Sequence, residues 1–239
     1  MFQTYLVEPL YNMFIFLIGV MPGGDVGLAI IALTLMVRIV FYPAFTASIR
    51  TQMGMHAVQG ELDEINKLYK NNAEERGRRT MALFKEHKVR PFASIVALMV
   101  QIPIFLALYF TFLREGLPNI STNLLYSFVQ APTTINIEFL GILNLLSTHV
   151  IPLAIVVGGL QYLVARYSFA RTPQPGGWAK ERTAAHHMQR RMILYFLPAI
   201  IAVVSYSLPA AAGLYFTAGN LISLGQEWLI RRSVVVKTP

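Results

Sequence analysis

The chain has 239 residues, of which 55% are hydrophobic and 13% are charged. Globular proteins carry about a quarter charged residues, so this composition excludes an ordinary water-soluble domain and predicts a membrane protein. The chain has no cysteine, which excludes a disulfide framework and thiol chemistry. A net charge of +8 would suit nucleic acid, but the basic loops that orient a membrane protein give the same sum, and we expect no DNA partner.

Residues 1–25 predict an external, amphipathic helix that lies in the membrane interface. Apolar residues recur at roughly helical spacing, while Gln3, Glu8 and Asn12 interrupt any full span. The alternative is a sixth, poor membrane span. The first twenty residues contain Glu8 but no Lys or Arg, so we expect no cleaved secretory signal.

Apolar stretches long enough to cross about 30 Å of hydrocarbon follow along the chain. They predict a first span at residues 26–47, a second at 91–113, a third at 150–169, and a fourth and fifth within 192–230. Pro209 and Gly213 supply the helix stop and the tight turn that divide the last stretch into two helices. The predicted fold class is therefore an all-α polytopic membrane protein with five transmembrane helices.

The basic residues cluster at one end of these spans. Residues 45–90 carry nine Lys and Arg, residues 166–191 carry six, and the tail after Ile230 carries three, which makes eighteen of the twenty. With five spans, all three segments fall on one side, which the positive-inside rule makes cytoplasmic. We expect the N-terminus outside, an external loop at 114–149, a cytoplasmic loop at 170–191 and a cytoplasmic tail at 231–239.

The charged segment at residues 48–90 predicts an antiparallel helical hairpin in the cytoplasm. Its apolar residues fall on one side of each helix: Leu62, Ile65, Leu68 and Tyr69 before the turn-like "KNNAEERG", and Met81, Leu83 and Phe84 after it. Helices this short are stable in water only when they cover each other's apolar faces. A solvated loop is the alternative.

The sequence lacks the usual motifs of enzymes. It contains no Gly-rich phosphate loop, no His-Glu-x-x-His, no Gly-x-Ser-x-Gly and no pair of intramembrane carboxylates. His186 and His187 are adjacent, whereas metal ligands on one helical face lie four residues apart. We expect no enzymatic activity, no cofactor and no metal site.

Arg38 is a basic residue inside the first predicted span, about 12 Å from its cytoplasmic end at 1.5 Å per residue. Three interpretations are open: snorkelling to the headgroups, a structural ion pair, or a water-filled cavity. Helical geometry tilts the side chain toward the N-terminus, away from the cytoplasm. Apart from Glu227 at the inner end of the last span, no other predicted span contains an Asp or Glu. The pattern therefore favours the cavity.

Other polar residues would line the same cavity. Thr34 lies one turn from Arg38 on the same face, and Gln101, Gln161 and Tyr215 each lie in a different apolar stretch. A positively charged, water-filled cavity in a helix bundle would attract polar or acidic segments of a chain that cannot otherwise enter lipid.

Three separated motifs resemble the YidC/Oxa/Alb family of membrane protein insertases. "LTLMVRIVFYP" is similar to the family's arginine-bearing span, "QIPIFLALYF" to its next span, and "LPAAAGLYFTAGNLISLGQEWLI" to its last helical hairpin. The resemblance covers nearly the whole chain, in the same order. It implies a hydrophilic groove, closed outward and open to the cytoplasm and the lipid, that receives nascent membrane segments without using ATP.

The resemblance also implies residue roles and partners. Arg38 is the groove arginine and Tyr215 a substrate-contacting aromatic, and Thr34, Gln101 and Gln161 join them by position and polarity. The implied partners are nascent membrane proteins, membrane lipids and a Sec translocon, with a signal-recognition-particle receptor at the hairpin and the ribosome at the basic tail. The implied location is the bacterial plasma (inner) membrane.

A small anion transporter or channel that uses Arg38 is the alternative function. It predicts an internal inverted repeat around a midplane site, and the sequence shows no repeat.

Overall fold

The computed structural model describes residues 5, 7–89, 99, 101–102, 105–106, 117, 119–120, 122–170 and 191–235. The predicted second span at 91–113 and cytoplasmic loop at 170–191 lie almost entirely outside these residues. The described elements are mainly helices, as predicted: α1 (Glu8–Val20), α2 (Val26–Val40), α3 (Tyr42–Ala57), α4 (Gln59–Leu68), α5 (Ala73–Glu86), α7 (Ile151–Ala170), α9 (Leu197–Ser207) and α10 (Ala210–Val235). Short turns of 3-10 helix, η2 (Pro22–Gly24) and η4 (Thr122–Leu124), and a π-helical segment, η6 (Met192–Phe196), accompany them.

One described helix is long and apolar enough to cross a membrane alone. It is Ile151–Ser168 within α7, where the third span was predicted at 150–169. A second candidate exists if α2 and the first part of α3 count as one bent span, and the helices Glu8–Val20 and Met192–Ser207 are apolar but shorter. The count of five spans therefore remains a prediction.

The first predicted span is not one continuous helix. α2 ends at Val40, α3 begins at Tyr42, and the two are bent by 74°. Pro43 lies in the first turn of α3, where it lacks an N–H and its ring conflicts with the carbonyl four residues earlier, so a straight helix cannot pass through this point. α3 then runs on to Ala57, past the predicted limit at Ala47.

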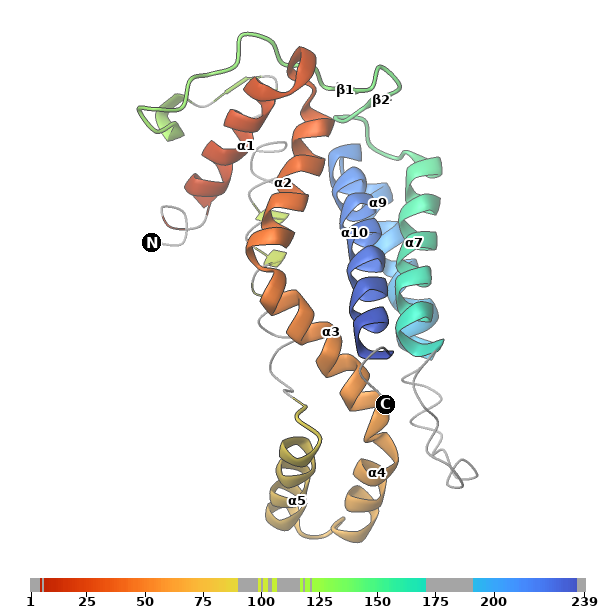
Figure 1. Ribbon diagram of the computed structural model, residues 1–239. Helices are drawn as coiled ribbons and strands as arrows, with labels where there is room; N and C mark the ends of the chain where they lie inside the picture. Colours follow the sequence, from red (N-terminus) through yellow and green to blue (C-terminus); the bar gives the residue numbers. More distant parts are fainter. Residues whose placement is uncertain are drawn as a thin grey trace.

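Helices α4 and α5 lie side by side beyond α3 (Figure 1). A small core holds them together, formed by Val58, Leu83, Phe84 and Val89 with Met55, Leu62 and Ile65 packed against it. Some of the apolar residues that were predicted to lie on the shared face of these two helices lie outside this core. Leu68 is 76% exposed because it ends α4, whereas the core surrounds Val58 at the start of that helix.

The turn between α4 and α5 is shorter than the sequence suggested. α5 already begins at Ala73, because the side chain of Asn72 caps it by accepting a hydrogen bond from the Glu75 N–H at 3.0 Å. Residues 73–77, which form the second half of the turn-like stretch "KNNAEERG", are therefore helical.

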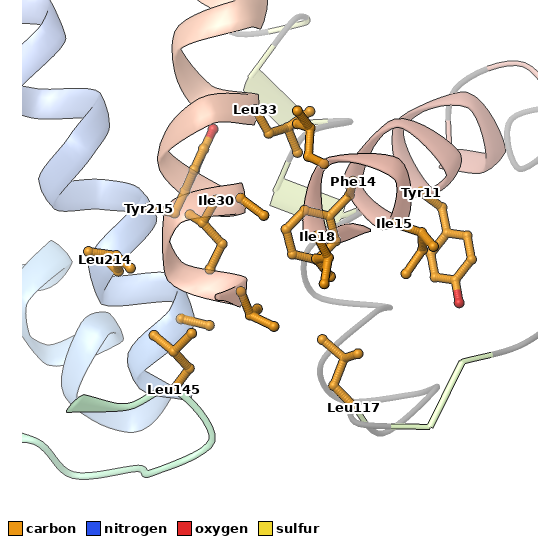
Figure 2. Packing of buried hydrophobic residues seen from close by; sticks show 14 of the residues in the cluster. Tyr11, Phe14, Ile15, Ile18, Ile30, Leu33, Leu117, Leu145, Leu214 and Tyr215 are labelled. Carbon is orange, nitrogen blue, oxygen red and sulfur yellow. The ribbon is translucent and has the colours of Figure 1, made fainter. Parts of the chain in front are cut away.

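The remaining helices form a bundle in which α10 lies between α2 and α7, with α9 packed on α7 (Figure 1). The main core joins α1, α2 and α10 (Figure 2). Phe14 and Ile18 from α1 lie toward Ile30 and Leu33 of α2, and Ile15 belongs to the same core.

α1 lacks the polar face expected of an interfacial amphipathic helix. One side packs on α2, and on the exposed side Phe16 and Val20 are 56% and 60% exposed. Its 13 residues extend about 20 Å, short of the about 30 Å that a span requires. α1 is therefore an apolar helix attached to the bundle by its own core contacts.

Gly213 does not end a helix, contrary to the expectation from the sequence. Leu208 and Pro209 make the turn between α9 and α10, and Gly213 lies inside α10. A Cβ at Gly213 would lie 2.5 Å from Leu153 Cδ2 and 2.8 Å from Ser205 Oγ. The glycine therefore permits close packing of α10 against α7 and α9.

The described part of the predicted external loop folds against the start of α2. It contains a two-stranded antiparallel ribbon, β1 (Glu138–Phe139) with β2 (Leu143–Asn144), which the sequence did not reveal. Asp25 anchors it: one carboxylate oxygen accepts the Leu28 N–H at 2.9 Å and caps α2, and the other accepts the Leu140 N–H at 3.1 Å. The buried carboxylate thus ties the ribbon to the helix that carries Arg38.

Candidate functional site

Arg38 lies in the last turn of α2, directly before the bend. The sequence had placed it well inside a straight helix, but α2 ends at Val40 because of the break at Pro43. A cation in this position also interacts favourably with the carbonyl end of the helix dipole.

The guanidinium of Arg38 contacts two other parts of the fold. Its Nη2 donates a hydrogen bond to the Gly219 carbonyl of α10 at 3.3 Å, and its Cζ lies 4.2 Å from the centre of the Phe45 ring in α3. The Gly219 carbonyl also accepts a shorter bond, 2.8 Å, from Ser223 Oγ. The bond from Arg38 is therefore the longer of the two and the easier to exchange for a better acceptor.

Arg38 is half-buried, and none of the described carboxylates forms a salt bridge with it. Burying part of a cation costs free energy that a carboxylate would offset. The ring of Phe45 and the carbonyl of Gly219 supply only partial compensation. The guanidinium therefore has capacity to bind an acidic or strongly polar group.

Tyr215 lies one turn before Gly219 on α10 and is buried in the main core (Figure 2). Its hydroxyl accepts a hydrogen bond from Gln101 Nε2. These two predicted residues are therefore joined directly, and Arg38 meets the same helix one turn further along.

The other two predicted residues are less closely connected. Thr34 is buried one turn before Arg38, but its hydroxyl donates to the Ile30 carbonyl of its own helix at 2.7 Å. Gln161 is half-buried in α7, which packs on α9 and α10, and no hydrogen bond among the described residues links it to the other four residues. The structure thus brings together Arg38, Tyr215 and Gln101, with Thr34 beside them.

Several polar contacts along α10 were not predicted from the sequence, although each of these polar residues interrupts an apolar stretch. Asn220 follows Gly219 in α10, and its side-chain nitrogen has no hydrogen-bond partner among the described residues. Gln226 Nε2 donates to Thr46 Oγ1 at 3.2 Å, and Ser168 Oγ donates to a carboxylate oxygen of Glu227 at 2.9 Å.

These last two pairs join α10 to α3 and to α7, near the end of the bundle opposite the β ribbon (Figure 1). Polar residues therefore follow α10 from the level of Tyr215 to its lower end. Over the residues that the structure describes, no group of three or more His, Asp or Glu side chains is arranged to hold a metal ion.

Comparison with known proteins gives one consistent result. The family model described as 60Kd inner membrane protein matches residues 17–237. The chain is 31% identical over 218 residues to the membrane protein insertase YidC of Anaeromyxobacter sp. (strain Fw109-5), which covers 89% of this chain and 34% of that protein. It is 30% identical over 209 residues to the membrane protein insertase YidC of Francisella tularensis subsp. novicida (strain U112), covering 87% of this chain and 33% of that protein. The chain spans about a third of the length of these curated relatives.

Proposed function

Because the chain belongs to the 60Kd inner membrane protein family, the family of the YidC insertases, we propose that it is a membrane protein insertase and chaperone of the bacterial inner membrane. It receives polar segments of nascent membrane proteins beside α2 and α10 and promotes their insertion, folding and assembly. It works alone or with a Sec translocon.

The observation that carries this proposal is Arg38, a half-buried cation without a salt bridge to any described carboxylate. Its charge lies between α2 and α10, beside the linked pair Tyr215 and Gln101. A polar or acidic segment that passes through lipid lacks hydration, and a buried cation offsets part of that cost. Arg38 therefore lowers the barrier for moving the hydrophilic segment of a client.

Burial of the client's apolar segment in lipid drives the reaction. Each leucine-like residue at the centre of a membrane helix contributes about 0.3 to 0.6 kcal/mol. A span of about 20 residues therefore supplies enough free energy without ATP. The groove that we propose for the client is open to the cytoplasm and the lipid and closed outward.

Topology and partners complete the proposal. Five spans with the N-terminus outside and the C-terminus in the cytoplasm would place α4 and α5 on the cytoplasmic side. There, this pair of helices would receive clients and a signal-recognition-particle receptor, and the basic tail would contact the ribosome.

The test is reconstitution of the chain alone into liposomes, followed by protease protection of a newly made single-span client with a short acidic outer tail. We expect protection with the wild type and at least about tenfold less with Arg38→Ala, because a hydrogen bond to a charged group contributes about 1.5 to 3 kcal/mol. Arg38→Lys keeps the charge and should retain more activity than Arg38→Ala. Arg50→Ala, which removes an exposed arginine of α3, is the matched control.

Two outcomes would contradict the proposal. Equal protection with Arg38→Ala and Arg38→Lys would exclude the electrostatic role of the arginine. Protection no greater than in empty liposomes would exclude an insertase that acts alone, and chloride flux into the same vesicles would then support the anion transporter instead.

A further inference from the structure

The contact between Arg38 and Phe45 depends on the bend between α2 and α3. In a straight helix these residues would be about 10.5 Å apart along the axis, and the arginine would tilt toward the N-terminus, away from the ring. In the structure the guanidinium carbon lies 4.2 Å from the ring centre. The 74° bend therefore creates the contact.

Phe45 is held firmly enough to orient the arginine. The side chain is 6% exposed, and its backbone N–H donates to the Phe41 carbonyl at 3.1 Å, in the first turn after the bend. A buried ring in a fixed turn has little rotational freedom. It therefore offers the guanidinium one defined surface.

The chemistry of this contact leaves the arginine able to bind a ligand. An aromatic face attracts a cation through its negative quadrupole. A guanidinium stacked on a ring uses its flat face, whereas its five N–H donors point outward in its own plane, where they match a carboxylate. The bond to Gly219 occupies one edge of that plane.

We propose that Phe45 is the positioning residue for Arg38. Its ring holds the guanidinium plane against the bend, so that the remaining N–H groups face the acidic or polar segment of a client. This inference rests on the proposed insertase function and assigns Phe45 a specificity role within it: Phe45 raises the preference for acidic over neutral outer segments.

The test compares insertion of two clients that differ only in an acidic or a neutral outer tail. Phe45→Leu removes the ring and keeps an apolar side chain, and it should lower the acidic-to-neutral ratio by about threefold to tenfold, the range expected for a partly desolvated cation–π contact. Phe45→Tyr keeps the aromatic face and should retain the ratio. Phe41→Leu is the matched control, because Phe41 is an exposed phenylalanine at the same bend.

If Phe45 acts through Arg38, the effects of substituting the two residues should not add. In an Arg38→Ala background, Phe45→Leu should cause no additional loss for the acidic client. A loss that affects both clients equally, or that Phe41→Leu reproduces, would overturn the proposal in favour of a general effect on the fold. An unchanged ratio with Phe45→Leu would overturn it directly.

An NMR measurement separates this inference from the proposed function. With labelled arginine in detergent micelles, the Arg38 Hε signal should be displaced by the ring current in the wild type and in Phe45→Tyr, but not in Phe45→Leu. If wild-type vesicles inserted no client, the insertase proposal would fail while this contact could still be observed. An Arg38 signal that is the same in Phe45→Leu and the wild type would overturn the contact itself.

Discussion

Replacement of Asp25 should weaken the attachment of the β1–β2 ribbon to the bundle. The carboxylate accepts two backbone N–H groups, from Leu28 at the start of α2 and from Leu140 in the turn between β1 and β2. Asp25→Ala removes both acceptors. Asp25→Ser keeps an N-cap for Leu28 but is too short to reach the ribbon as well.

The magnitudes follow from these two bonds. A lost N-cap costs about 0.5 to 2 kcal/mol, and a lost hydrogen bond to a charged group costs about 1.5 to 3 kcal/mol. Asp25→Ala should therefore lower the free energy of unfolding by about 2 to 5 kcal/mol. Asp25→Ser should lower it by about 1.5 to 3 kcal/mol, from the Leu140 contact alone.

Two measurements check this prediction in detergent micelles. The thermal unfolding temperature should be highest for the wild type, lower for Asp25→Ser and lowest for Asp25→Ala. Limited proteolysis near Ile142, which is 88% exposed, should be faster in both variants, because a less firmly attached ribbon opens more often. An Asp25→Ala protein with the unfolding temperature and the cleavage rate of the wild type would refute the reasoning.

The remaining predictions concern the packing of α10 and the charge pairs of α5. Gly213→Val should lower the free energy of unfolding by about 1 to 3 kcal/mol, because the valine side chain would overlap Leu153. Adding Leu153→Ala should recover part of that loss. Thermal unfolding of the single and double variants measures both effects. Hydrogen bonds from Arg78 and, to a smaller extent, from Arg79 hold the pKa of Glu75 below its ordinary 4.5. The stabilisation of α5 by these pairs is therefore present above pH 4.5 and is lost as the pH falls through the lowered pKa. An NMR titration of the Glu75 carboxylate measures this pKa.

Controls are available for both predictions. Gly159 has open space around it, so Gly159→Val should leave the unfolding temperature nearly unchanged, and an equal loss there would show that helix propensity rather than overlap is responsible. For the charge pairs, Arg78→Gln should raise the pKa of Glu75 toward 4.5. A Glu75 pKa that stays the same in this variant would contradict the assigned cause.

Much of the architecture could be predicted because its signals are local. Composition and the length of apolar stretches indicated a helical membrane protein, and the stretch at 150–169 matches α7 within one residue at each end. Arg38 was predicted to be a site residue because a cation in an apolar stretch is unusual in any packing arrangement. The family resemblance rested on the same local motifs.

Other features depend on contacts that no local pattern encodes. Pro43 was visible in the sequence, but the 74° bend and the resulting contact between Arg38 and Phe45 depend on how α3 leaves α2. The partner of Arg38 lies 181 residues away at Gly219, and the partner of Asp25 lies 115 residues away at Leu140. Such pairs form only when helices and loops pack.

The sequence by itself therefore determined which segments are apolar and which side chains are costly to bury, because hydropathy is a property of neighbouring residues. Only the tertiary structure decided that Gly213 serves packing rather than a turn, and that Phe45 lies under Arg38. These outcomes depend on the distances between helices and on the direction of one bend.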